Sequence, residues 1–98
     1  MTVPVLLRRQ ARREFDEAAN WYEQRRAGLG VRFVLAVQRV LGAIADNPAR
    51  YPEVFDDVRE GLVPGFPFCV YHRVEAGQVI VLAVFHTSRD PSIWQSRV

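Results

Sequence analysis

Two side chains capable of chemistry, His86 and Arg89, follow an apolar run near the end of the chain. The run comprises residues 79–84, and the segment FHTSRDP comes directly after it. An imidazole at a strand end can act as a general acid or base, because it ordinarily titrates near neutral pH. A guanidinium can hold a phosphate or a carboxylate through two hydrogen bonds. The segment is therefore typical of a catalytic centre or a recognition edge; alternatively, His86 only hydrogen-bonds a neighbouring loop and holds the strand end in place.

Cleavage of RNA is one reaction that such residues could support. Attack by a 2′-hydroxyl requires a base, an acid and a cation for the pentacoordinate phosphate. His86 could serve as the acid or base and Arg89 as a cation. Further residues of the second half could complete the set: Arg59 and Arg73 as cations, and Tyr71 or Glu60 as the second proton carrier. The alternative is that these arginines are ordinary surface residues paired with nearby acids: Glu60, Glu75 or Asp90.

The sequence indicates neither a metal site nor a cofactor. Two separated His residues and the single Cys69 do not provide a zinc-ligand spacing. The chain also lacks the phosphate-binding and nucleophile motifs GxxxxGK[ST], GxGxxG and GxSxG. We therefore expect a protein that works without a cofactor, in which Cys69 is a small apolar core residue.

Asp90 and Pro91 are explained more simply as the start of a helix. Aspartate is a good N-cap residue, and proline is favoured at the first helical position. We therefore expect a short C-terminal helix that carries Ile93 and Trp94. His86 and Arg89 are then the residues of this segment left to carry chemistry or recognition.

Four arginines, Arg8, Arg9, Arg12 and Arg13, lie in the first turns of a predicted helix. Positive charge at a helix N-terminus opposes the helix dipole and is locally unfavourable. Two ion pairs at i,i+4 spacing would offset this in part: Arg12 with Asp16 and Arg13 with Glu17. The four arginines form either a solvated face or a docking patch for an acidic protein or a nucleic acid.

The apolar spacing predicts the elements that position these residues. Apolar side chains recur at helical intervals in two segments: Ala11, Phe15, Ala18 and Tyr22, and then Phe33, Val37, Val40, Leu41 and Ile44. In chain order the expected elements are a strand over 3–7, a helix from Arg8 to a Gly-rich turn at 28–30, a second helix ending at Asn47-Pro48, a loop over 48–52, and strands near 58–62 and over 66–74 and 79–86, the last two joined by a hairpin turn at 75–78.

The strand over 79–86 is apolar on both faces, so we expect it at the centre of the sheet with both faces covered. Simple alternation places its His86 on the same face as Ile80, Leu82 and Val84. In the preceding strand, alternation separates two sets: Phe68, Val70 and His72 on one face, and Cys69, Tyr71 and Arg73 on the other.

The fold class expected is α+β with the order β-α-α-β-β-β. A helical hairpin packs on one face of a small antiparallel sheet, and a short C-terminal helix or a partner chain covers part of the other. The expected helix–sheet contact joins Phe15, Tyr22, Phe33, Val37, Val40 and Ile44 to Val81 or Leu82.

The bulk composition fits one domain over residues 1–98, because the chain is too short for two cores. A single cysteine, no long apolar span and no signal peptide predict a cytoplasmic protein without a membrane partner. The net charge of +2 is unevenly divided. Residues 1–50 hold nine Arg and five acidic residues, a balance of +4, whereas residues 51–98 hold four Arg and six acidic residues, a balance of −2.

Several motifs in order resemble the RelE/ParE family of toxins from bacterial type II toxin–antitoxin systems, often labelled plasmid stabilisation proteins. They are A-x-x-E-F-x-E-A-x-x-W-Y-E from Ala11, Gly28-Leu29-Gly30 with Phe33, Pro48 with Pro52, Arg59 before Phe66-Pro67-Phe68 and Tyr71, and Leu82-Ala83-Val84-Phe85-His86 with Arg89, Pro91, Trp94 and Arg97. The resemblance implies a small cytoplasmic toxin, held silent in a hetero-oligomer with an antitoxin from the same operon. RelE-like members of the family cleave mRNA on the ribosome, and ParE-like members poison DNA gyrase.

The charge division favours the ParE-like branch, which acts by binding gyrase. A sheet that grips RNA should be basic, and the half of the chain that forms this sheet is mildly acidic. The tail after Asp90 also lacks the Tyr or His that nuclease branches often carry. On this reading the candidate binding residues are Arg8, Arg9, Arg12, Arg13, His86, Arg89 and Trp94.

Two alternatives remain open from the sequence. The first is a RelE-like, ribosome-dependent and metal-independent endoribonuclease, whose catalytic set would be His86, Arg89, Arg59, Arg73 and Tyr71. The second is a degenerate, non-toxic member that serves only to bind the antitoxin.

Overall fold

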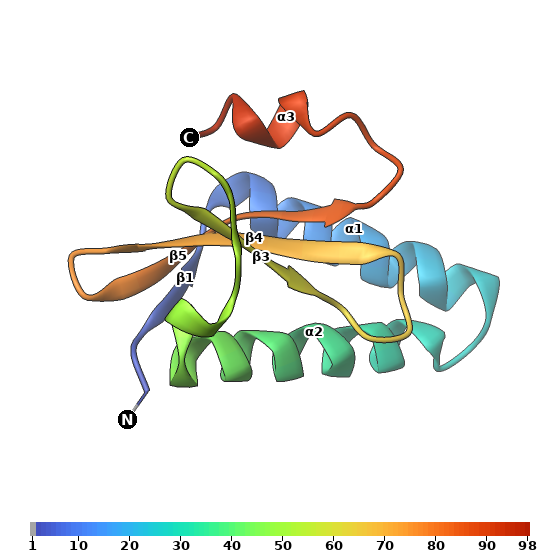
Figure 1. Cartoon of the computed structure of the whole chain (residues 1–98). Coiled ribbons are helices and arrows are strands. Elements are labelled where there is room, and N and C mark those ends of the chain that lie inside the picture. The colour runs from blue at the N-terminus through green and yellow to red at the C-terminus, as the bar shows by residue number, and fades with distance from the viewer. Residues whose placement is uncertain (1) are drawn as a thin grey trace.

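A five-stranded sheet with helices on both faces forms the protein (Figure 1), and the computed structural model describes residues 2–98. In chain order the elements are β1 (Val5–Leu7), α1 (Arg9–Arg25), α2 (Leu29–Asp46), the 3₁₀ turn η1 (Pro48–Arg50), β2 (Glu53–Phe55), β3 (Val58–Leu62), β4 (Phe68–Glu75), β5 (Gln78–His86) and α3 (Ser92–Gln95). The strand order is β1-β5-β4-β3-β2. None of the described helices has the length and apolar character needed to cross a membrane.

β5 is the second strand of this order, flanked by β1 and β4, and it carries the buried core residues predicted for it: Val79, Val81, Leu82, Ala83, Val84 and Phe85. It pairs antiparallel with β4 and parallel with β1, in the register Val5 to Val79. The predicted antiparallel sheet is confirmed at the other three pairs, and the β1–β5 pair differs from it in being parallel. After β1 the chain passes through both helices and through β2, β3 and β4 before it runs along β5 in the same direction as β1. Parallel neighbours need a long connection of this kind.

β2 is a strand that the sequence pattern did not reveal. It has three residues and pairs antiparallel with β3 across a tight turn at Asp56 and Asp57. Asp56 adopts a φ of 50° there, and aspartate tolerates this left-handed conformation better than most residues. Three residues are too few for a period of two to be recognised, so the segment falls between the loop predicted over 48–52 and the strand predicted near 58–62.

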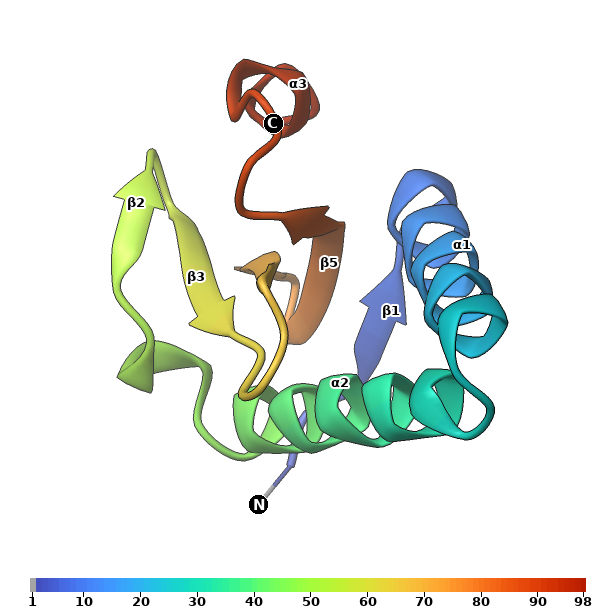
Figure 2. The same ribbon diagram turned by 90° about the vertical axis from the view of Figure 1, so that its right-hand side faces the viewer.

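The two long helices pack on one face of the sheet, as Figure 2 shows from the side. Phe33, in the second turn of α2, is fully buried and meets Phe15 of α1 at 6.0 Å and Phe68 of β4 at 5.0 Å between ring centroids. All six predicted helix residues belong to this cluster or pack on it, and the sheet residue beneath them is Val81. Leu82 lies in the cluster on the opposite face.

The α1–α2 turn is held by a side chain that caps the second helix from the first. Glu23 accepts hydrogen bonds from the backbone N–H of Gly28 at 2.8 Å and of Gly30 at 2.9 Å. These are N–H groups at the start of α2 that have no partner within the helix. Gly28 adopts a φ of 87°, and a Cβ at Gly30 would lie 2.5 Å from the carbonyl oxygen of Ala19. Gly28 is thus favoured by its positive φ, and Gly30 by the lack of room for a side chain; both belong to the predicted stop signal.

A β-bulge in β5 reverses the predicted alternation at its end. Tyr71 pairs with Ala83 and His72 pairs with Val81, so Leu82 is an extra residue without a cross-strand partner. Val84 therefore packs with the helices, whereas Ile80 and Leu82 pack on the other face. His86 pairs with Phe68 of the helix-side cluster, so the predicted grouping of His86 with Ile80 and Leu82 is wrong.

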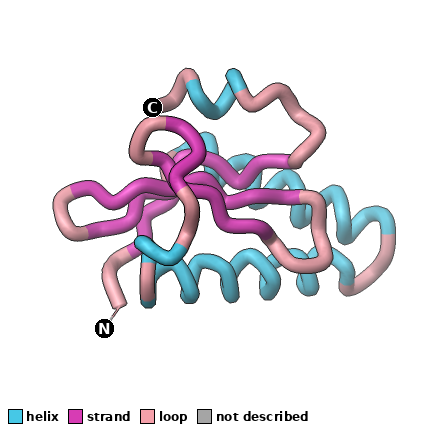
Figure 3. Tube along the Cα trace, in the orientation of Figure 1, coloured by secondary structure: helices cyan, strands magenta, loops and turns pink. Residues whose placement is uncertain are grey.

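α3 covers part of the second sheet face (Figure 3), as expected for a short C-terminal helix. Trp94 is 2% exposed and stacks on Tyr71 with ring centroids 4.0 Å apart. The carboxylate of Asp90 accepts a hydrogen bond from the N–H of Ser92 at 3.0 Å, so it satisfies the first N–H of α3, although the helix begins at Ser92, one residue later than predicted. Cys69 is buried on the same face, as a core residue should be.

Candidate functional site

His86 lies at the end of β5 on the side of α1, with its ring edge-on to Phe68 at 5.1 Å. Its Nδ1 is 3.0 Å from the backbone N–H donor of Ser88 and 2.8 Å from the Ser88 hydroxyl. A backbone N–H can only donate, so Nδ1 must be an acceptor and the neutral ring carries its proton on Nε2. At its remaining nitrogen His86 therefore offers a hydrogen-bond donor and no lone pair.

An apolar pocket of about 410 Å³ opens beside this imidazole. It is lined by Ala18, Trp21, Tyr22, Pro67, Phe68 and His86. The Trp21 side chain is 52% exposed, and the Arg25 guanidinium lies 4.3 Å from the centre of its ring. A second hollow continues past His86 to Arg89 and Glu14. A largely apolar surface with a few convergent polar groups is what a binding site requires.

Glu14 of α1 is the centre of an ion-pair network that fixes Arg89. Its carboxylate accepts from Arg89 Nη1 at 3.0 Å and from both terminal nitrogens of Arg97, at 3.0 and 2.9 Å. The Arg97 and Glu14 side chains are only 13% and 11% exposed. Arg89 also lies over the Phe85 ring at 4.2 Å. One nitrogen of the Arg89 guanidinium, which was predicted to hold a phosphate, thus already contacts a carboxylate.

The same network completes the hydrogen bonding of β5 beyond the end of β1. β1 stops at Leu7, and the part of β5 from Leu82 onwards has no strand on that side. Glu14 accepts from the N–H of Val84 at 3.2 Å, and Arg97 donates to the C=O of Leu82 at 3.1 Å. Unpaired backbone groups in a buried position are costly, so this pair acts as a substitute for the missing strand.

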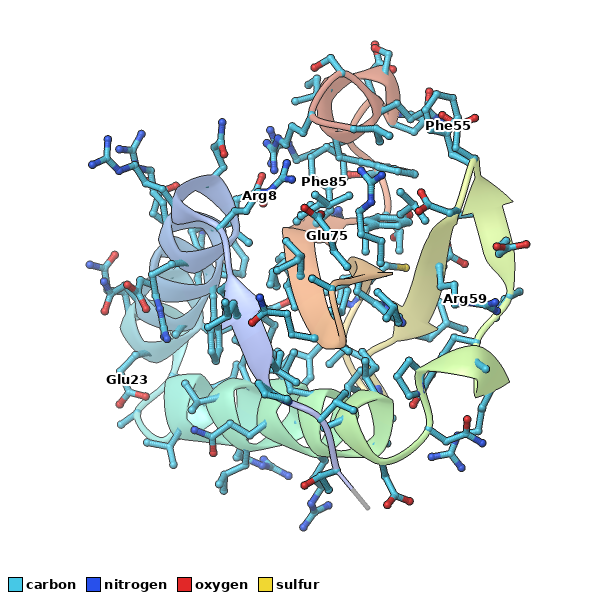
Figure 4. The ribbon with its side chains drawn as sticks, turned by 90° about the vertical axis from the view of Figure 1, so that its left-hand side faces the viewer. Arg8, Glu23, Phe55, Arg59, Glu75 and Phe85 are labelled. Atoms are coloured by element: carbon cyan, nitrogen blue, oxygen red, sulfur yellow. The ribbon has the colours of Figure 1, made fainter. Side chains whose placement is uncertain are left out.

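The predicted catalytic arginines are not gathered around His86. Arg73 pairs across the sheet with Ile80, six positions from His86, which is roughly 20 Å along the strand. Its guanidinium is 3.4 Å from Asp57. Arg59 lies on the side of the sheet formed by β2 and β3, and Figure 4 shows it apart from Phe85. Its guanidinium donates to the carbonyl oxygen of Tyr51 and lies 3.8 Å from the carboxylate of Glu53.

Tyr71 is directed away from His86, onto the face covered by α3. Its hydroxyl donates to Glu60 at 3.0 Å, and the ring is stacked on Trp94. Burial raises the pKa of the Tyr71 hydroxyl, and the neighbouring Cys69 and Glu60 raise it further. A phenol held in its neutral form inside the core is not placed to exchange protons with a substrate.

The four arginines at the start of the helical region do not form the predicted ion pairs. In the described part of the chain, the guanidinium nitrogens of Arg12 and Arg13 lie more than 4.0 Å from the carboxylate oxygens of Asp16 and Glu17, respectively. Arg8 instead donates to the backbone carbonyl of Arg97 at 2.9 Å, which joins the start of α1 to the C-terminal tail. Arg9, Arg12 and Arg13 are exposed on α1, so they remain available as a basic surface.

Trp94, a predicted binding residue, lies instead in the core. It stacks on Tyr71 and meets Phe55 at 5.8 Å; Figure 4 shows Phe55 projecting from β2 beside α3. Its burial makes it unavailable for a surface contact while α3 is in place. An aromatic residue in a short terminal helix gives the same sequence signal whether it binds a partner or anchors the helix.

Ion pairing divides the arginines by sequence half. All four arginines of residues 51–98 are paired with a carboxylate: Arg59 with Glu53, Arg73 with Asp57, and Arg89 and Arg97 with Glu14. The paired acids differ from those expected, which were Glu60, Glu75 and Asp90. Glu14 was missed because it lies 75 and 83 positions from its partners, and its position in the A-x-x-E-F motif was the one available signal. Among residues 2–98, no three His, Cys, Asp or Glu side chains are grouped as metal ligands.

Comparison with known proteins identifies the family. The model of the ParE toxin of type II toxin–antitoxin system, parDE, matches residues 5–91, and the chain therefore belongs to the ParE toxin family. The chain also resembles a solved structure described as the chromosomal ParDE TA system from P. aeruginosa, with a TM-score of 0.78 over 89% of this chain and 98% of that one. The identity is 14%, so this likeness concerns the fold. A search of curated protein sequences found no match.

Proposed function

We propose that this protein is the growth-arresting toxin of a type II toxin–antitoxin module and that it acts by binding DNA gyrase. A cognate antitoxin neutralises it by forming a complex. Membership of the ParE toxin family supports the toxin role, and the solved ParDE system with the same fold supports an antitoxin partner. The choice between binding and bond cleavage depends on the chemistry of the site.

The pairing of every arginine of the sheet half with a carboxylate is the observation that carries this choice. A ribonuclease needs an uncompensated cation beside the scissile phosphate. Of the three arginines in the candidate catalytic set, Arg89 lies nearest His86, and its Nη1 donates to the carboxylate of Glu14. The Nε2–H of His86 further favours a role as a donor in a complex over a role as a base.

A ribosome-dependent endoribonuclease is the second candidate. It is favoured by one observation, namely that His86 and Arg89 border the same hollow. Rearrangement of Glu14 on a ribosome would release Arg89 for a phosphate.

Induction of the protein alone, with and without its antitoxin, tests the proposal. We expect growth arrest that co-expression of the antitoxin relieves, loss of plasmid supercoiling, and no new mRNA 5′ ends. Ribosome-dependent cleavage of mRNA would instead establish the second candidate. Normal growth at confirmed soluble expression would contradict both and leave a non-toxic, antitoxin-binding subunit.

A further inference from the structure

The apolar pocket beside His86 has walls from α1, from the loop before β4 and from the neighbouring ends of β4 and β5. Two contacts fix these walls. The N–H of Thr87 donates to the carbonyl oxygen of Pro67 at 2.9 Å, and Phe68 pairs with His86 across the sheet. The pocket is therefore already formed in the free protein. Its volume of about 410 Å³ lies within the range of clefts that hold small molecules.

Aromatic rings form much of the surface of this pocket. Between ring centroids, Trp21 lies 5.1 Å from Tyr22, Tyr22 lies 6.2 Å from Phe68, and Phe68 lies 5.1 Å from the His86 imidazole. Each of these pairs is edge-to-face, so the walls offer both ring faces and ring edges to a ligand. A planar aromatic ligand gains from both kinds of contact. Trp21 is half exposed and has apolar surface left to bury.

The polar groups at this pocket are hydrogen-bond donors. His86 presents its Nε2–H, since Ser88 occupies Nδ1. Arg25 lies over Trp21, and within residues 2–98 its guanidinium forms no ion pair. Of the described residues that line the pocket, none is acidic. A ligand must therefore supply acceptors, and the unpaired charge of Arg25 favours an anionic one.

The positions of these two donors set the length of the ligand. Ala18 borders His86 in both hollows, and Arg25 lies seven residues further along the same face of α1. Seven residues correspond to about 10.5 Å along the helix. Two fused aromatic rings with a carboxylate at one end and an oxygen at the other are of about this length.

We propose that this pocket binds a planar, two-ring aromatic carboxylate. The rings lie among Trp21, Tyr22 and Phe68, the carboxylate meets Arg25, and an oxygen at the far end accepts from the Nε2–H of His86. An aliphatic acid of the same size would forgo the contacts with the aromatic walls. The inference goes beyond the proposed function, because the ligand is a small molecule and its binding does not depend on the target of the toxin.

Titration calorimetry with 6-hydroxy-2-naphthoate tests the inference on the full chain. Two control compounds each lack one polar group: 2-naphthol has no carboxylate, and 2-naphthoate has no hydroxyl oxygen. We expect a dissociation constant on the order of 10–1000 µM for the probe and roughly twofold to tenfold weaker binding of each control. No binding of the probe at millimolar concentration, or equal binding of all three compounds, would overturn the inference.

Matched pairs of variants separate this pocket from the rest of the surface. Arg25→Gln and Arg26→Gln remove the same charge from adjacent, exposed positions. Arg25→Gln should weaken binding of the probe by roughly twofold to fivefold, and Arg26→Gln should leave it unchanged. Trp21→Ala should weaken binding by roughly tenfold, whereas Leu35→Ala, which removes a similarly exposed side chain from α2, should not. Equal effects within either pair would contradict the proposed site.

The two tryptophans report where the ligand binds. Trp21 lines the pocket, whereas Trp94 is buried on the opposite face of the sheet. In NMR spectra of isotope-labelled protein, the probe should shift the indole N–H signal of Trp21 and leave that of Trp94 in place. Trp21→Phe assigns the two signals. A shift of the Trp94 signal alone, or of neither signal at saturating probe, would place the ligand elsewhere and overturn the inference.

Discussion

At the end of β5, two donors of Ser88 converge on one nitrogen of His86 and so decide what the other nitrogen can do. Arg89 is similarly committed, because Glu14 holds its guanidinium and Phe85 lies beneath it. Ser88 thus fixes which nitrogen of His86 carries the proton, and Glu14 partly neutralises the charge of Arg89. A partner protein can still contact both residues, because the Nε2–H of His86 is a hydrogen-bond donor and the guanidinium of Arg89 is 42% exposed.

Substitution of His86 by glutamine separates binding from catalysis. In a protein that acts by binding, His86→Gln removes one hydrogen bond, worth about 1 kcal/mol, and weakens the target complex by less than about tenfold. Toxicity should therefore return at higher expression. In a nuclease that uses His86 as an acid or base, the rate should fall by about 10²–10⁴-fold. The measurement is growth against inducer concentration, with soluble protein quantified in parallel.

Glu14→Gln should destabilise the protein by about 2–4 kcal/mol. The amide keeps an acceptor for the N–H of Val84 but leaves the nearly buried Arg97 without its counter-charge. Denaturant unfolding measures the loss. Glu17→Gln, a change on the exposed surface of the same helix, is the control and should be neutral; equal stability of the two variants would contradict the role given to Glu14.

His72 makes stability depend on pH. It is fully buried, its Nδ1 lies 3.2 Å from the carbonyl oxygen of Val70, and its Nε2 has no partner in the described structure. Burial lowers the pKa of His72 below its ordinary value of 6.5, and nearby Arg59 lowers it further. The unfolded chain then binds more protons between the lowered pKa and 6.5, so stability is complete above pH 6.5 and falls as pH decreases through this interval.

Unfolding free energies measured between pH 5 and 8 test this assignment. The wild type should lose stability below about pH 6.5, and His72→Phe, which keeps an aromatic ring of similar size, should give a flatter profile in the same interval. An identical slope in both proteins would show that another group is responsible.

The element with the tightest steric requirement is the α1–α2 turn. Gly30→Ala would place a Cβ 2.5 Å from the carbonyl oxygen of Ala19 and 2.8 Å from the Cβ of Glu23, and should cost about 1–3 kcal/mol because backbone cannot move aside easily. Gly42, in the same helix, has no neighbour within 4 Å of an added Cβ. Gly42→Ala should therefore stabilise by about 0.5–1 kcal/mol, and thermal unfolding of the two variants should shift in opposite directions.

The elements that sequence reasoning recovered are those with a repeated local pattern. The helices showed their apolar stripe over four or five turns, and the strand over 79–86 was identified by its length and apolar composition. The bulge at Leu82 has no such signature, because it depends on how two strands register in space. One extra residue was enough to move His86 to the opposite face from the one predicted. β2 was missed because three residues show no periodic pattern. The parallel β1–β5 pair could not be predicted, because it depends on the path of the chain between the two strands.

At the scale of the whole molecule, the uneven charge of the sequence becomes a division between two kinds of surface. All four arginines of residues 51–98 contact a carboxylate, whereas within residues 2–98 Arg13, Arg32 and Arg39 on the two helices form no ion pair. Net charge per half was readable from composition. Which arginines are paired was not, because Arg89 and Arg97 take their carboxylate from Glu14 in the other half of the chain.

The most direct test of binding without bond cleavage is a supercoiling assay with purified DNA gyrase, relaxed plasmid and this protein, run beside a translation reaction that is sampled for mRNA 5′ ends. The account predicts inhibition of supercoiling that the antitoxin relieves, inhibition by His86→Gln at roughly up to tenfold higher concentration, and intact mRNA. Unchanged gyrase activity together with ribosome-dependent mRNA cleavage that His86→Gln abolishes would contradict it.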